Sequence, residues 1–143
     1  MYNDFTRRQK IIIESNKNFK EKRRVCHSNQ LKRNENCDEF ALVDLKISQG
    51  KVTKIQFCAQ GCHLLVASCF LFEKILFGKD VKKSIFLIEK YRKMIDFGKI
   101  DPDLLDLNAL VMTKSHPNRV SCVKIAADLL EEKLKKYGKS NSN

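Results

Sequence analysis

The stretch FALVDLKISQGKVTKIQF, from Phe40 to Phe57, decides the fold of this chain. Its first half alternates apolar and polar residues with a period of two, which is typical of a half-buried β-strand. A turn over Ser48 to Lys51 follows, and a second alternating run then places Thr53, Ile55 and Phe57 on one face. The stretch therefore predicts an antiparallel hairpin. A third strand is expected somewhere in Val25 to Leu31.

Helices are expected on both sides of this hairpin in the sequence. After Gly61, the run from Leu64 to Phe77 is apolar on nearly every side, which indicates a central helix that other elements cover. The other expected helices are an N-terminal one over Phe5 to Phe19 with Phe5, Ile12, Ile13 and Phe19 as contacts, one from the cap Asp80 to near Gly98, and a last one from Val120 to Tyr137 that Gly138 ends. The predicted fold class is α+β, a small antiparallel sheet of about three strands with helices packed on one face.

The length of 143 residues suits one hydrophobic core that needs no disulfide staples. Positive charge is concentrated near the start, because residues 1–33 hold ten Lys or Arg and three Asp or Glu. We expect a basic N-terminal helix or arm over 1–33, a main domain over 34–138 and a disordered tail over 139–143. The basic arm could bind nucleic acid, anionic lipid or an acidic partner protein, or simply be solvated.

The sequence predicts a cytoplasmic protein with no membrane association. No apolar run approaches the roughly 20 residues that cross a bilayer, and the first ten residues do not resemble a secretory signal. Six cysteines would then stay mostly reduced, so thiol or metal chemistry is favoured over a disulfide framework.

Three cysteines lie where secondary-structure elements begin or end. Cys37 precedes the first strand, Cys62 follows the second at the start of the apolar helix, and Cys122 falls in the opening turns of the last helix. The hairpin brings the Cys37 and Cys62 ends of its strands together. Helix N-termini favour the thiolate form that binds metal or attacks sulfur. Because no CxxC pair exists, these cysteines do not indicate a zinc finger or ribbon.

Three thiolates and one carboxylate would complete a tetrahedral zinc shell. Glu39 would project to the same side as Cys37 if the strand already begins there, and Asp38 competes with it. His63 is a further competitor, although ligation next to Cys62 is sterically awkward. The alternative interpretation is that all three are ordinary buried cysteines. Core or surface roles are expected for the remaining candidates, Cys26, Cys58, Cys69 and His116.

The contexts of these cysteines resemble the U-type iron-sulfur cluster assembly proteins, the family of SufU, IscU and the N-terminal domain of NifU. The family motifs are Asn-Pro-x-Cys-Gly-Asp, Phe-x-Gly-x-Gly-Cys-x-Ile-Ser-x-Ala-Ser and Pro-x-Arg-x-x-Cys. The matching segments here are Asn34 to Glu39, Phe57 to Ser68 and Pro117 to Cys122. The resemblance extends from about Asn34 to Leu134. It implies the SufE/NifU-like fold, and the long stretch between Cys62 and Cys122 looks like the insertion of the SufU branch.

A SufU-like chain implies a zinc ion held by Cys37, the acidic residue at position 39, Cys62 and Cys122. It also implies a sulfur carrier rather than a stand-alone enzyme. A SufS-like, pyridoxal-phosphate-dependent cysteine desulfurase would donate sulfur to Cys37, or alternatively to Cys122. Arg119 would support the partner or the thiolate, and downstream iron-sulfur assembly or acceptor proteins would receive the sulfur. The near alternative is an IscU-type scaffold that builds a [2Fe-2S] cluster on the same three cysteines.

The chain departs from the family at positions that matter for this chemistry. Cys-Gly-Asp has become Cys37-Asp38-Glu39, so the fourth ligand is longer and a flexible glycine is lost. Glu35 replaces a proline and Ala59 replaces a glycine. A hypothesis of another class is a basic nucleic-acid-binding module, but residues 7–33 lack the interleaved aromatic residues of a stacking platform.

Overall fold

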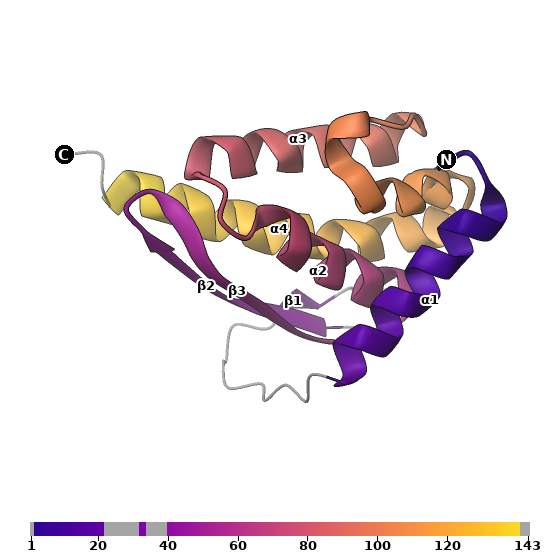
Figure 1. The fold of residues 1–143 in the computed structure, drawn as a ribbon, viewed down its shortest axis with the longest axis horizontal. Helices are drawn as coiled ribbons and strands as arrows, with labels where there is room; N and C mark the ends of the chain where they lie inside the picture. Colours follow the sequence, from indigo (N-terminus) through magenta and orange to yellow (C-terminus); the bar gives the residue numbers. More distant parts are fainter. Residues whose placement is uncertain (1, 22–31, 34–39, 141–143) are drawn as a thin grey trace.

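The computed structural model describes residues 2–21, 32–33 and 40–140 of the chain (Figure 1). Its elements are α1 (Phe5–Glu21), β1 (Lys32–Arg33), β2 (Phe40–Ser48), β3 (Lys51–Gln60), α2 (His63–Leu76), α3 (Val81–Phe97), the 3-10 segment η1 (Pro102–Ser115) and α4 (Pro117–Ser140). The predicted α+β class is confirmed. No helix within these ranges has the length and apolar character needed to cross a membrane.

The predicted hairpin is present as the antiparallel pair β2 and β3, but its inner face differs at one position. The register shifts next to Ile47, which pairs with Val52, whereas Lys46 pairs with Lys54. This bulge leaves Thr53 without a partner in the register and turns it to solvent. Val52 takes the buried place that the alternation had assigned to Thr53.

The third strand is shorter than the sequence analysis suggested. The strand β1 has only two residues, Lys32 and Arg33, which pair with Ala41 and Phe40. The range Val25 to Leu31, in which a third strand was expected, lies outside the described residues. The sheet is therefore mainly the two-stranded hairpin, with β1 as a short edge.

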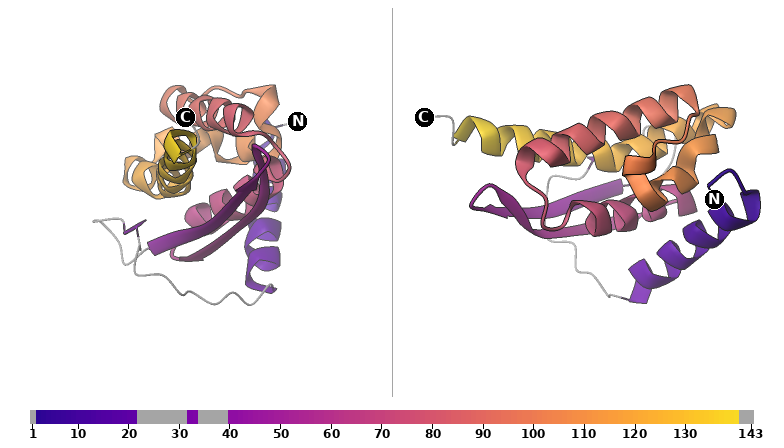
Figure 2. Two further views of the ribbon diagram at one scale, coloured as in Figure 1. Left: turned by 90° about the vertical axis from the view of Figure 1, so that its left-hand side faces the viewer. Right: turned by 45° about the horizontal axis from the view of Figure 1, so that its top comes forward.

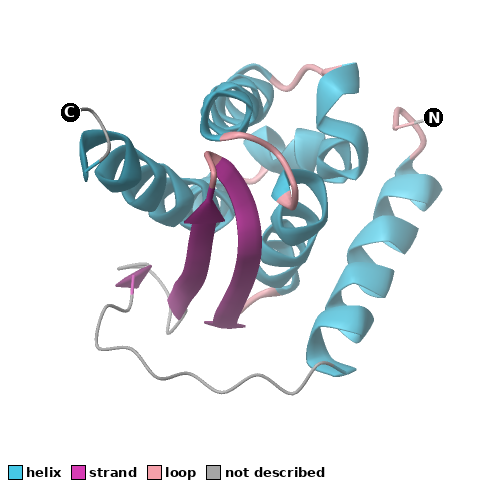
Figure 3. Cartoon of the chain, turned by 60° about the vertical axis from the view of Figure 1, so that its left-hand side comes forward, coloured by secondary structure: helices cyan, strands magenta, loops and turns pink. Residues whose placement is uncertain are grey.

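The helices cover one face of the sheet, as expected (Figures 1 and 2). The helix α2 packs on β3 and α4 packs on β2, and α3 with η1 forms a further layer on top of them. Figure 3 shows this order from the side, with α1 standing beside α2 rather than on the strands. The apolar character of α2 fits this central place, because every residue from Leu65 to Glu73 is buried.

The helix α1 extends slightly beyond the predicted Phe5 to Phe19, and two of its four predicted contacts were wrong. Ile12 and Phe19 are buried, but Phe5 and Ile13 are 65% and 64% exposed. The buried face instead contains Ile11, together with the polar residues Ser15 and Asn16. The N-terminal helix thus contributes to the main hydrophobic core.

The predicted start of α3 after Asp80 and its end at Gly98 are confirmed, but the predicted end of α4 at Gly138 is wrong. The Asp80 side chain caps α3 by accepting a hydrogen bond from the Lys83 N–H, and Gly98 ends it in the left-handed conformation with φ of 66°. Gly138 does not stop α4, which continues to Ser140.

Two carboxylates of α4 hold one arginine of α3. Arg92 Nη1 lies 2.6 Å from Glu131 Oε2, and Arg92 Nη2 lies 2.6 Å from Asp128 Oδ1. Lys135 adds a contact of 3.0 Å to Glu131 one turn further along α4. The hydrogen bond from Lys135, together with the charge of Arg92, lowers the pKa of Glu131 although partial burial opposes this.

We expect Glu131→Gln to reduce the free energy of unfolding by about 1 kcal/mol at pH 7. Because folding lowers the pKa of Glu131 from its usual 4.5, the carboxylate stabilises the fold above that pH and loses its effect as the pH falls further. Urea unfolding of both proteins from pH 7 to pH 3 should show the difference closing below about pH 4.5. Glu132→Gln, at an exposed position on the same helix, serves as the control, and equal losses in both variants would contradict the assignment.

Candidate metal and sulfur site

Cys62 lies at the junction between β3 and α2. Gly61 turns the chain there with φ of 154°, a value that residues with side chains rarely adopt. Cys62 is then the N-cap residue of α2, and its carbonyl accepts the first hydrogen bond of the helix from Val66 at 3.2 Å. Its side chain makes no capping hydrogen bond to the helix backbone. The half-buried thiol of Cys62 therefore lies at the positive end of the α2 helix dipole.

Cys122 lies in the second turn of α4 and is completely buried. Its thiol donates a weak hydrogen bond to the carbonyl of Asn118, with the sulfur 3.9 Å from the oxygen. The expected location in the opening turns of the last helix is confirmed. A sulfur with no solvent exposure is suited to hold a ligand within the protein rather than to meet a partner at the surface.

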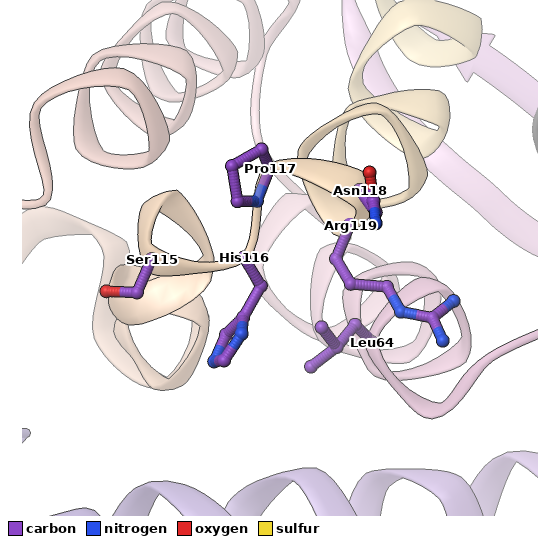
Figure 4. A pocket seen from close by; sticks show the side chains of 6 residues that line it. All are labelled: Leu64, Ser115, His116, Pro117, Asn118 and Arg119. Atoms are coloured by element: carbon purple, nitrogen blue, oxygen red, sulfur yellow. The ribbon is translucent and has the colours of Figure 1, made fainter.

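The starts of α2 and α4 lie next to each other. They border one open cavity of about 470 Å³ that is lined by Leu64 of α2 and by residues 115–119. Figure 4 shows Leu64 beside Arg119 across this cavity, with His116 on the other side of Leu64. Cys62 is the N-cap residue two positions before Leu64, and Cys122 follows Arg119 three positions along α4, so the two helix starts that carry these cysteines border the same cavity.

The remaining predicted ligands, Cys37, Asp38 and Glu39, lie outside the described residues. The strand register still bears on them, because Phe40 pairs with Gln60. The chain therefore enters β2 opposite the residue from which β3 leaves toward Cys62. Within the described ranges, no cluster of three or more His, Cys, Asp or Glu side chains could hold a metal ion.

Among the described cysteines, Cys62, Cys69 and Cys122 are thiols outside any disulfide. Cys69 is buried in α2, as expected for a core residue. Cys58 is disulfide-bonded, whereas the six cysteines were expected to stay mostly reduced.

Arg119 and His116 stand at the mouth of the cavity. Both are exposed, and the Arg119 N–H donates to the His116 carbonyl at 2.8 Å where α4 begins. Arg119 thus adds a cationic residue to the rim of the cavity.

Asn16 of α1 is a positioning residue that the sequence analysis missed. Its side-chain amide donates to the carbonyls of His63 and of Ile12, each at 2.9 Å, and its oxygen lies 3.3 Å from His63 Nδ1. Asn16 is only 7% exposed. The N-terminal helix is therefore joined by hydrogen bonds to the residue that follows Cys62. The available signal was a polar residue on the otherwise apolar stripe of Ile12 and Phe19.

We expect Asn16→Ala to reduce the free energy of unfolding by about 1–3 kcal/mol, because the carbonyls of His63 and Ile12 lose the hydrogen bonds that the buried Asn16 amide donates to them. Chemical denaturation measures this change. Asn18→Ala, an exposed position on the same helix, is the control and should change stability by less than about 0.5 kcal/mol. An Asn16→Ala protein as stable as the control variant would show that these hydrogen bonds contribute nothing.

Comparisons with known proteins agree on the family. No family model matches the chain. It is 31% identical over 109 residues to the iron-sulfur cluster assembly scaffold protein IscU of Thermotoga maritima, covering 75% of this chain and 76% of the relative. It is 24% identical over 105 residues to the zinc-dependent sulfurtransferase SufU of Bacillus subtilis, covering 72% and 71%. An uncharacterized protein of Mycoplasma pneumoniae is 26% identical over 133 residues, covering 92% and 95%.

Solved structures show the same fold. A candidate iron-sulfur cluster assembly scaffold protein of the SUF system from Fervidobacterium islandicum matches with a TM-score of 0.72 at 18% identity, over 85% of this chain and 91% of the other. The N-terminal part of a NifU-like protein from Brucella abortus matches with a TM-score of 0.64 at 15% identity, over 80% and 83%. The chain belongs to the NifU/IscU/SufU family of iron-sulfur cluster assembly proteins, as its cysteine motifs indicated.

Proposed function

We propose that the protein is a zinc-bound sulfur acceptor in iron-sulfur cluster assembly. Its zinc ligands would be Cys37, Cys62, Cys122 and Glu39, with Asp38 as the alternative to Glu39. One observation supports this proposal above all. The starts of α2 and α4, which bear Cys62 and Cys122, border the same cavity. The relative in Bacillus subtilis, a zinc-dependent sulfurtransferase by name, supports the choice of metal and reaction.

The described residues fit a zinc site in their chemistry. Cys62 and Cys122 supply two soft sulfur donors, and neither sulfur is in a disulfide. The weak 3.9 Å hydrogen bond from Cys122 to the Asn118 carbonyl would be lost when Cys122 becomes a thiolate. The pairing of Phe40 with Gln60 sets the start of β2 beside the end of β3, and Cys37 and Glu39 come just before Phe40 in the sequence. Zinc in such a site holds thiolates without changing their redox state.

In this proposal, different residues of the protein have different roles in sulfur transfer. Cys122 is fully buried, so it serves as an anchor, and this favours Cys37 over Cys122 as the acceptor. The Cys37 thiolate attacks the terminal sulfur of a persulfide on the cysteine desulfurase. A new S–S bond forms on Cys37 as the S–S bond of the donor breaks, and the donor cysteine leaves as a thiolate, so no oxidant is needed. Arg119, exposed beside the cavity, offers a cation to the approaching donor.

A persulfide-labelling assay with a pyridoxal-phosphate-dependent cysteine desulfurase and cysteine tests the acceptor. Peptide mapping should find the persulfide on Cys37 of the wild type, and Cys37→Ser should lose the label. Cys69→Ala, a change at a buried thiol elsewhere on α2, should be labelled as the wild type is. Wild-type labelling of Cys37→Ser, or a label found on Cys122, would show that the assignment is wrong.

A [2Fe-2S] scaffold on the same cysteines is the second candidate. It is favoured by the 31% identity to a protein named as an assembly scaffold in Thermotoga maritima. Anaerobic reconstitution with iron and sulfide separates the two functions. A scaffold yields a stable coloured protein that passes its cluster to an apo-acceptor, whereas the sulfur acceptor stays colourless and retains zinc.

A further inference from the structure

The outer side of α3 carries a line of lysine and phenylalanine side chains that the sulfur chemistry does not use. We call it the basic-aromatic ridge, and its members are Lys82, Lys83, Phe86, Lys90, Lys93 and Phe97. The spacing of Lys82, Phe86, Lys93 and Phe97 places them on one side of a helix, opposite the buried residues of α3. Phe86 and Phe97 are 43% and 65% exposed.

Two lysines of the ridge lie over the same ring. Lys83 Nζ is 5.0 Å and Lys90 Nζ is 4.8 Å from the centroid of Phe86. Lys90 also contacts Asp103 at 2.6 Å and Asp101 at 3.3 Å, so its charge is partly offset. Lys82, Lys83 and Lys93 form no ion pair within the described part of the chain. Glu89 is the one acidic side chain of α3 that borders the ridge without such a partner there.

An open hollow of about 400 Å³ adjoins the Phe97 end of the ridge. Met94, Phe97 and Ile100 give it apolar walls. The charged residues around it are Lys90, Lys93, Lys99 and Asp101. An apolar hollow with an excess of positive charge around it is suited to an anionic group that is joined to an apolar one.

The composition of the ridge discriminates among possible partners. Protein interfaces are depleted in lysine and enriched in arginine and aromatic residues, so the four lysines of the ridge are unusual for a contact with another protein, although its two phenylalanines are not. A nucleic-acid base would need an accessible aromatic face, whereas two ammonium groups already lie over Phe86. Lysines that flank exposed phenylalanines are typical of helices that lie on an anionic bilayer, where the rings reach the acyl boundary.

We propose that the basic-aromatic ridge of α3 docks the protein on the surface of a bilayer that contains anionic phospholipid. Figure 2 shows α3 in the layer farthest from the sheet, so a flat surface can approach it along its length. The ridge is separate from Cys62 and Cys122, which lie at the starts of α2 and α4. The sequence-based expectation of no membrane association considered only spanning segments and secretory signals, and a surface contact needs neither.

Vesicle co-sedimentation with the full chain tests the charges. The protein should bind vesicles of phosphatidylcholine mixed with phosphatidylglycerol and not vesicles of phosphatidylcholine alone. Each lysine near an anionic surface strengthens binding about fivefold, so Lys82→Gln combined with Lys93→Gln should weaken it about 25-fold. The control combines Lys17→Gln with Lys20→Gln, the same charge change at exposed positions of α1, and should stay near wild type. Equal losses in the two variants, or no binding by the wild type, would overturn the proposal.

The phenylalanines supply a second, independent test. The chain has no tryptophan, so Phe97→Trp provides a single fluorescent reporter on the ridge. Its emission should shift to the blue on mixed vesicles and stay unchanged on neutral ones. Phe97→Ser should weaken binding, while Phe5→Ser, at an aromatic residue that is also 65% exposed, should not. Vesicle binding without an emission shift would show that another surface makes the contact.

Discussion

Cys62→Ser and Cys122→Ser are each expected to lower the affinity for zinc by more than about 100-fold. Loss of groups that only support the ligands already costs 10–100-fold, and loss of a ligating thiolate should cost more. The expectation rests on the proposed zinc site and on the two adjoining helix starts that carry these cysteines. Zinc content after anaerobic purification, followed by competition with a chelator, measures the effect.

Cys69→Ala separates loss of a ligand from loss of a thiol. Cys69 lies on α2, the helix that begins directly after Cys62, and it is as buried as Cys122. The variant should retain about one equivalent of zinc even where its stability falls by the 1–3 kcal/mol typical of a disturbed core. If Cys62→Ser retains as much zinc as Cys69→Ala, then Cys62 is not a ligand.

The sequence predicted the hairpin well because side chains in a β-strand alternate between two faces, and this period of two is visible in the sequence. It failed at Thr53 because a bulge inserts one residue and reverses the faces beyond it. Alternation alone does not mark such a shift. Here the correction moves Val52 into the core and turns Thr53 toward the Lys46 carbonyl, to which its hydroxyl donates at 3.2 Å.

The buried face of α1 shows a different limit of sequence analysis. Apolar residues were counted as contacts, yet the helix buries Ser15 and Asn16 and exposes Phe5 and Ile13. The two polar residues can be buried because they are hydrogen-bonded, as when Ser15 Oγ donates to the Ile11 carbonyl at 2.7 Å. A sequence does not state which polar groups will find partners. For the same reason, the sequence analysis missed the hydrogen bonds between Asn16 and His63, the residue after Cys62.

For the candidate site, the sequence predicted the placement of Cys62 and Cys122 at helix starts, and this is confirmed. It did not predict that α4 begins beside α2, because that depends on how η1 returns the chain. Within η1, Leu105 adopts φ of 50° and ψ of −129°, values unusual for a residue with a side chain. The alternation and helix periods used on the sequence cannot anticipate such a kink.

Tyr91→Ala is expected to reduce the free energy of unfolding by about 3–5 kcal/mol, the range for removing a large aromatic side chain from a core. Tyr91 has no solvent exposure, and its ring packs edge-to-face on Phe72 with centroids 4.7 Å apart. Its hydroxyl donates to the Val123 carbonyl at 2.7 Å, which ties α3 to α4. Phe86→Ala, at a half-exposed aromatic residue of the same helix, should cost less than about 1 kcal/mol.

Tyr91→Phe isolates the hydroxyl and gives the prediction a pH signature. It should cost about 1–2 kcal/mol at pH 7, because a buried hydrogen bond is lost. Burial, and to a lesser extent the nearby Cys69, raises the pKa of Tyr91 well above its usual 10.0. The folded state therefore keeps a proton that the unfolded state releases above pH 10, so the wild type loses about 1.4 kcal/mol per pH unit there and Tyr91→Phe does not. Urea unfolding between pH 8 and pH 11 should show the two proteins converging, and a constant difference would mean that Tyr91 ionises equally in both states.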